Sequence, residues 1–144
     1  MGQINWGRVI GGGLMAGVVM NVSEFLLHAV VLRADGQALM EQWNRQGFNI
    51  KEDPTLLSIL IGVTFLLGVL AVWTYAAIRP RFGPGPKTAI IAGLAVWAMS
   101  YFYAGVYVYA GIVILPAKLV WCPVVWSLFE VPIATLIGGW FYKE

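Results

Sequence analysis

Charged side chains and cysteines are scarce in this sequence of 144 residues. Only 11% of the residues are charged, whereas a soluble domain usually has about 25%. The composition therefore excludes an ordinary water-facing surface and predicts one that faces lipid. The lone cysteine, Cys122, excludes an intrachain disulfide and a metal site made of several cysteines. A net charge of +2 without any basic run gives no indication of nucleic-acid binding.

Motifs typical of catalytic sites are absent as well. The sequence has one histidine, no pair of cysteines, no HExxH motif and no phosphate-binding loop ahead of a helix. The three glycines at 11–13 lack the preceding strand and the spacing of a dinucleotide-binding fingerprint. We therefore predict that the protein is not an enzyme.

Long apolar stretches are what the sequence has in abundance, since 60% of its residues are hydrophobic. A helix needs about 20 residues to cross the hydrocarbon layer, and four stretches reach that length: about 9–32, 56–78, 88–110 and 115–140. The first is too long for the apolar region of a signal peptide, so we expect it to be retained. We predict an all-α, polytopic membrane protein in which residues 1–144 form a single domain, a bundle of four transmembrane helices.

The connections between these stretches predict the orientation of the bundle. The turn at 79–87, RPRFGPGPK, contains basic residues and no acid, whereas the loop at 33–54 mixes both signs. Cytoplasmic loops are enriched in Lys and Arg, so we expect the 79–87 turn and both termini to lie in the cytoplasm of a bacterial cell, with the protein in the inner membrane. Leu39, Met40 and Trp43 stand at helical spacing in the outer 33–54 loop, which predicts a short interfacial helix between the first two spans.

One face of the first span is formed by glycine and polar residues. Gly13, Gly17, Asn21, Glu24 and His28 are spaced by 4, 4, 3 and 4 residues, so all five share one helical face. The glycines allow close approach of another helix. A charged side chain facing lipid at a helix centre costs roughly 2.5–3.5 kcal/mol even on the insertion scale. We therefore expect this face to point into the bundle or toward another protein.

The third span offers partners for these polar groups. Ser100, Tyr103 and Tyr107 are spaced by 3 and 4 residues and so share a face. Counting from the cytoplasmic start of each helix places Tyr103 near the depth of Glu24, and Tyr107 near that of His28. We expect the Tyr103 hydroxyl to donate a hydrogen bond to Glu24, because an unpaired buried carboxylate is costly.

The fourth span places Glu130 close to the middle of the membrane, about two turns deeper than Glu24 by the same counting. Pro132 follows it and frees the carbonyl four residues earlier, so a kink is expected. A kinked helix with a central glutamate is typical of proton-handling proteins, but it is also a simple way to bend a helix. Ala134 and Gly138, spaced by four, predict a further strip for close helix packing.

The sequence leaves more than one function open. The leading interpretation is an association module, a homo-oligomer or a subunit of a larger membrane complex, whose polar core is hydrogen-bonded and whose other contact is membrane lipid. The alternative is a small oligomeric proton- or ion-linked transporter or channel that uses Glu24, His28 and Glu130. The same three side chains could bind a divalent ion, and His28 could be an axial ligand of a haem or chlorin. We assign no metal, and the sequence does not identify a cofactor.

Three segments carry a resemblance to a known group: INWGRVIGGGLMAGVVMNVSEFLL at the start, RPRFGPGPKTA followed by GLAVW, and ATLIGGWFYKE at the end. Together they resemble an uncharacterised family of small four-helix integral membrane proteins of bacteria. The resemblance covers most of the chain and implies a four-helix architecture in the inner membrane. It implies no activity, so it assigns no functional residue.

Overall fold

The computed structural model describes residues 4–48, 53–111 and 115–142, and within these ranges it contains helices and no strand. Residues 49–52 of the predicted outer loop lie outside the described ranges. The described helical elements are α1 (Trp6–Leu26), η1 (Leu27–Val31), α2 (Arg33–Arg45), α3 (Pro54–Phe82), α4 (Pro86–Trp97), η2 (Ala98–Phe102), α5 (Tyr103–Gly111) and α6 (Ala117–Phe141).

Four continuous helical runs are long and apolar enough to cross a membrane: Trp6–Val31, Pro54–Phe82, Pro86–Gly111 and Ala117–Phe141. Each has 25 residues or more, beyond the roughly 20 that the hydrocarbon layer requires. The all-α, four-helix bundle of a multi-pass membrane protein is thus confirmed.

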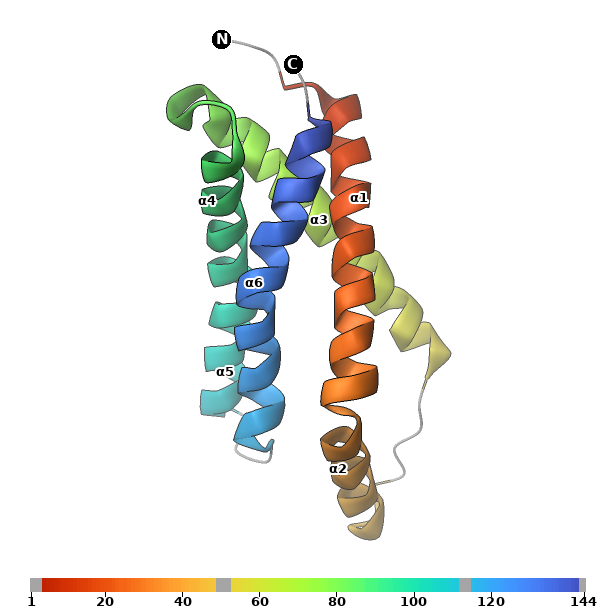
Figure 1. Cartoon of the computed structure of the whole chain (residues 1–144). Coiled ribbons are helices and arrows are strands. Elements are labelled where there is room, and N and C mark those ends of the chain that lie inside the picture. The colour runs from red at the N-terminus through yellow and green to blue at the C-terminus, as the bar shows by residue number, and fades with distance from the viewer. Residues whose placement is uncertain (1–3, 49–52, 112–114, 143–144) are drawn as a thin grey trace.

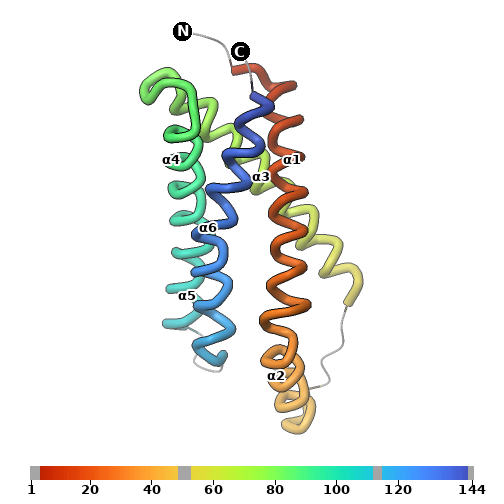
Figure 2. Tube along the Cα trace, viewed as in Figure 1, coloured from red at the N-terminus to blue at the C-terminus, as the bar shows by residue number. Residues whose placement is uncertain are grey.

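The chain reverses after each span, so the two termini lie at the same end of the molecule (Figure 1). That end, which also contains the α3–α4 connection, is called the terminal end below, and the opposite one the α2 end. α6 lies between α1 and the α4–α5 helix, while α3 crosses behind α6 and α1 on a diagonal, as the trace in Figure 2 makes clear.

The predicted turn at 79–87 is shorter in the structure, because α3 continues to Phe82 and α4 begins at Pro86. The chain reverses through Gly83 and Gly85, whose φ angles are 81° and 132°. Side chains disfavour such positive φ values, so glycine is the residue suited to both positions.

Glycines hold the terminal half of the bundle together. Gly13 and Gly17 lie directly against Val69 and Phe65 of α3, and a Cβ on Gly138 would stand 2.5 Å from the Gly12 carbonyl oxygen. Because these backbones touch, α1 crosses α3 and α6 at the small separation that small residues permit in membranes. Ala134 and Gly138 on α6 are both buried in this region.

The α2 end is more open. α2 follows α1 beyond the bundle (Figure 1), with Leu39 buried on one face. An ion pair of 2.6 Å between Lys118 and Asp35 connects α2 with the start of α6. In α3, the buried residues begin only at Gly68, because its first half diverges from the other helices.

Candidate functional site: a carboxyl cluster inside the bundle

Polar side chains from three helices meet inside the membrane-spanning part of the bundle. Ser23 and Glu24 come from α1, Tyr101 from η2, and Trp126 and Glu130 from α6. We call these five residues the carboxyl cluster. They lie beyond the glycine contacts, on the side of the α2 end.

Glu24 has partners on two sides. The Tyr101 hydroxyl donates a hydrogen bond of 2.8 Å to its carboxylate oxygen Oε1. On the other side, His28 Nδ1 lies 3.4 Å from Oε2. The Glu24 side chain is 21% exposed and that of His28 is 62% exposed, so this part of the cluster reaches toward the surface.

His28 also contacts the backbone, with Nδ1 at 2.9 Å from the Glu24 carbonyl oxygen. A carbonyl oxygen only accepts hydrogen bonds, so in this contact Nδ1 carries the hydrogen. In the neutral ring Nε2 is then the acceptor. The imidazole therefore bonds to its own helix on one side and offers a proton-accepting nitrogen on the other.

The prediction that Tyr103 donates to Glu24 is wrong. Tyr103 and Tyr107 are 66% and 70% exposed, and their rings stack on each other at 6.3 Å. The prediction assumed an uninterrupted α-helix, but residues Ala98–Phe102 form a π-helix. A π-helix adds a residue to the turn and so rotates the residues that follow. As a result Tyr101 faces Glu24, and the predicted tyrosine face points outward.

Asn21 and Ser100, which were expected in the polar core, bond to their own helices. Asn21 Nδ2 donates to the Gly17 carbonyl oxygen at 2.8 Å, and the Ser100 hydroxyl donates to that of Val96 at 2.7 Å. Such bonds satisfy the polar side chain within its own helix, so it needs no hydrogen-bond partner on another helix. Both residues are half-buried.

Glu130 is the most isolated member of the cluster. It is only 5% exposed, and neither carboxyl oxygen has a hydrogen-bond partner among the described residues. Ser23 and Trp126 lie close to it, but the Trp126 indole N–H donates to the Ser23 hydroxyl oxygen at 2.8 Å. The Trp126 N–H is thus engaged with Ser23, whose own hydroxyl hydrogen remains available to Glu130.

The two carboxyl groups are electrostatic neighbours. Glu130 interacts with Glu24 through space and also with Tyr101. Trp126, which bonds to the residue before Glu24, precedes Glu130 by four residues, so the two glutamates differ in depth by between one and two helical turns.

Polar groups continue from the cluster in one direction only, within the residues that the structure describes. Toward the α2 end, His28 lines a cavity of about 410 Å³ together with Arg33 and Gln37. Toward the terminal end the neighbours of Glu130 are buried small or apolar residues, and the hydroxyl of Thr135 bonds to the Val131 carbonyl oxygen. The cluster is therefore open at one end and closed at the other.

The described residues do not bring together three or more His, Cys, Asp and Glu side chains that could hold a metal ion. Glu24, His28 and Glu130 thus do not form the ligand set that their sequence positions left open. Cys122 is half-buried and is not a member of the cluster.

Three cluster members were not predicted. Trp126 is four residues from Glu130, hence on the same helical face, so helical spacing could have identified it. Ser23 is adjacent to Glu24 and does not share its face, so spacing does not identify Ser23. Tyr101 could not be found in this way, because its position depends on the π-helix.

Fold and site together define a small multi-pass helical membrane protein with ionisable groups inside its bundle. Comparisons with protein-family models, curated proteins and solved structures found no match to this chain.

Proposed function

We propose that this protein is a non-enzymatic, proton-handling membrane protein, in which Glu24 and Glu130 exchange a proton with solvent at the α2 end. The observation that carries this proposal is the burial of Glu130, which is 5% exposed, near the second carboxyl group of Glu24.

The chemistry of the pair supports proton exchange. An ionised carboxylate in apolar surroundings costs far more free energy than the neutral acid. Two neighbouring carboxylates in an apolar interior also repel each other when both are charged. The pair is therefore best accommodated with at least one of the two carboxyl groups protonated.

The route to solvent is given by the partners of Glu24. Tyr101 holds its carboxylate in place, and His28 stands next to it with an outward-facing ring. An imidazole both accepts and donates protons and is the usual proton shuttle in proteins. A proton arriving through the cavity at His28 would thus reach Glu24, whose charge interacts with Glu130 through space.

The closed side of the cluster limits the role of a single chain. Glycine contacts and apolar residues fill the terminal half, so the described residues offer a proton bound at Glu130 no polar path onward. The proposed site is one-sided. Passage across the whole membrane would require a second copy or a partner subunit.

The orientation of the site in a cell follows from charge. Arg8, Arg79, Arg81 and Lys87 all belong to the terminal end, and no acidic residue accompanies them in the adjoining described segments. On the positive-inside rule this end is cytoplasmic, in the inner membrane of a bacterium. The cavity at His28 then opens to the outside.

Modification by a hydrophobic carbodiimide, which reacts with protonated carboxyl groups in apolar surroundings, tests the proposal. We expect the reagent to modify Glu130 in the membrane-embedded protein and to spare the exposed Glu41, as read by peptide mass spectrometry. Modification should fall as the pH is raised. Glu130→Gln should abolish it, and the matched Glu41→Gln variant should leave it unchanged. An unmodified Glu130 in the folded protein at all pH values would overturn the proposal.

Self-association is a second candidate function, favoured by the part of α3 that precedes Gly68, which we call the free half of α3. No residue before Gly68 in this helix is buried, and a side chain at Gly62 would meet nothing within 4 Å. A second copy that packs on this half would cover the side chains of α3 that no helix of the same chain covers. Native mass spectrometry of the detergent-extracted protein tests this: a dimer that Gly62→Leu dissociates supports it, and a monomer refutes it.

A further inference from the structure

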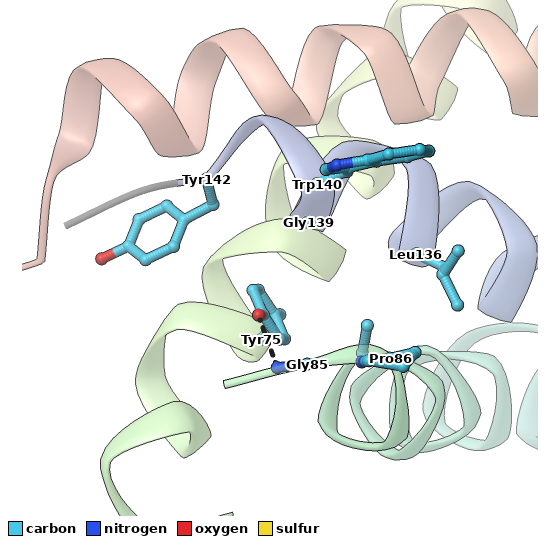
Figure 3. Close-up of a pocket in the computed structure, with 8 residues that line it drawn as sticks. Tyr75, Gly85, Pro86, Leu136, Gly139, Trp140 and Tyr142 are labelled. Atoms are coloured by element: carbon cyan, nitrogen blue, oxygen red, sulfur yellow. Dashed lines mark hydrogen bonds between the residues drawn. The ribbon is translucent and has the colours of Figure 1, made fainter. Parts of the chain in front are cut away.

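A second cavity lies at the terminal end, and none of its lining residues belongs to the carboxyl cluster. It has a volume of about 440 Å³ and is bounded by α3, by α6 with the chain just after it, and by the start of α4. Figure 3 shows Tyr75, Trp140 and Tyr142 around it, with Leu136 and Pro86 also contributing to its walls. Its lining is almost entirely apolar.

The walls of this cavity are held by the backbone. The Gly85 N–H donates a hydrogen bond of 3.3 Å to the Tyr75 hydroxyl, and the Asn5 N–H donates one of 3.3 Å to that of Tyr142. The two rings meet edge to face at 6.1 Å. Since both hydroxyl groups are bonded to backbone, the rings present their apolar surfaces to the cavity in a fixed arrangement.

Glycine at position 139 keeps the cavity open. A Cβ at Gly139 would lie 3.3 Å from the Tyr75 ring, so a larger side chain would project into the space between α6 and α3. Trp140, the next residue, is 80% exposed and leaves one side of the cavity accessible from the surroundings.

Two basic residues belong to the elements that bound this cavity. The Arg79 guanidinium lies 5.5 Å from the centre of the Tyr142 ring. Lys87 is exposed and follows the lining residue Pro86. The described segments at this end, 4–9, 79–90 and 138–142, contain no acidic residue. Basic residues thus outnumber acidic ones in the described part of this end, and the interior of the cavity is apolar.

We propose that this cavity binds one acyl chain of an anionic phospholipid whose headgroup lies against Arg79 and Lys87. Its volume is about three times that of the roughly 150 Å³ apolar cavity that takes up benzene, which is enough for a substantial length of hydrocarbon chain. Water is a poor occupant because the lining offers it few hydrogen bonds. Basic pockets between spanning helices are typical sites for anionic headgroups.

The site is independent of the carboxyl cluster, so its test does not depend on proton exchange. Delipidated full-length protein in a neutral detergent would be titrated with phosphatidylglycerol or phosphatidylcholine, and bound lipid counted by native mass spectrometry. We expect one tight phosphatidylglycerol site and a weaker response to phosphatidylcholine. Arg79→Gln and Lys87→Gln should each lower the affinity for phosphatidylglycerol by about fivefold.

Matched variants separate this site from general attraction to a basic surface. Arg8→Gln removes a cation from the same end, on α1 and outside the cavity, and should leave the tight site unchanged. Leu136→Trp should fill the cavity and remove the site, whereas Leu60→Trp on the free half of α3 should not. The melting temperature without lipid identifies any variant that fails to fold, in which case Lys87→Gln at the exposed position remains decisive.

Fluorescence places the lipid. Phospholipids with brominated acyl chains quench nearby tryptophans, and the quenching due to Trp140 is the difference between the unmodified protein and Trp140→Phe. This difference should saturate together with the tight site. Equal losses in Arg8→Gln and Lys87→Gln, or binding that survives Leu136→Trp in a folded protein, would overturn the proposal.

Discussion

At the scale of single residues, the cluster contains two glutamates in different situations. Glu24 accepts a hydrogen bond from Tyr101 and lies beside His28, whereas Glu130 is more deeply buried and has no such bond among the described residues. Removing a partner from a bonded buried group leaves the other group unsatisfied and costs free energy. Tyr101 is therefore expected to matter for stability more than the two tyrosines that follow it.

Tyr101→Phe tests the bond to Glu24. Loss of the hydroxyl leaves a carboxylate without its donor, so the free energy of unfolding should fall by about 1–3 kcal/mol. Tyr103→Phe is the matched control, because the Tyr103 side chain is 66% exposed and should be replaceable without measurable effect. Thermal unfolding of both variants in detergent is the measurement. Equal melting temperatures would contradict the assigned bond.

At the scale of elements, the bundle depends on close contacts in its terminal half and on irregular helix geometry near the cluster. Gly12, Gly13 and Gly17 place the α1 backbone against α6 and α3. The π-helices η1 and η2 then change the helical register next to His28 and at Tyr101. Single π-helical turns often occur at functional sites, and here they position the side chains that bond to Glu24.

Gly12→Ala compared with Gly11→Ala tests the packing of α1. A Cβ at Gly12 would collide with the Gly138 backbone, while one at Gly11 would meet nothing within 4 Å. We expect Gly12→Ala to lower the melting temperature clearly, as overpacking costs about 1–3 kcal/mol. Gly11→Ala should be neutral or should stabilise the helix by up to about 1 kcal/mol. A tolerated Gly12→Ala would show that α1 and α6 are further apart than described.

At the scale of the whole molecule, four antiparallel spans place both termini and the α3–α4 connection on one side. The proposed proton site and the proposed lipid site therefore lie toward opposite faces of the membrane. The first is reached from the α2 end, and the second lies among the basic residues of the terminal end.

The orientation can be measured with single cysteines in a Cys122→Ser background. Gln42→Cys in α2 and Pro84→Cys in the α3–α4 connection both replace exposed residues. With the terminal end in the cytoplasm, a membrane-impermeant maleimide should label Gln42→Cys in intact cells, and Pro84→Cys only after permeabilisation. The reverse pattern would place the basic end outside and contradict the positive-inside assignment.

The sequence by itself determined the fold class of this protein, because hydropathy and span length are local properties. A segment that is long and apolar enough crosses the bilayer as a helix. Four apolar stretches and the glycines of the 79–87 turn were sufficient to predict four helices and a reversal between the second and third. The sequence also identified Glu24, His28 and Glu130, because ionisable residues within apolar stretches stand out by type alone.

Only the tertiary structure decided how these residues meet. Tyr101 replaces Tyr103 beside Glu24 because a π-helix rotates the register, and no periodicity in the sequence marks that turn. The packing of α6 on its neighbours decides that Glu130 is buried. The same packing leaves the apolar cavity beside Tyr75. Such distances depend on side-chain packing between segments far apart in the chain, which local sequence patterns do not contain.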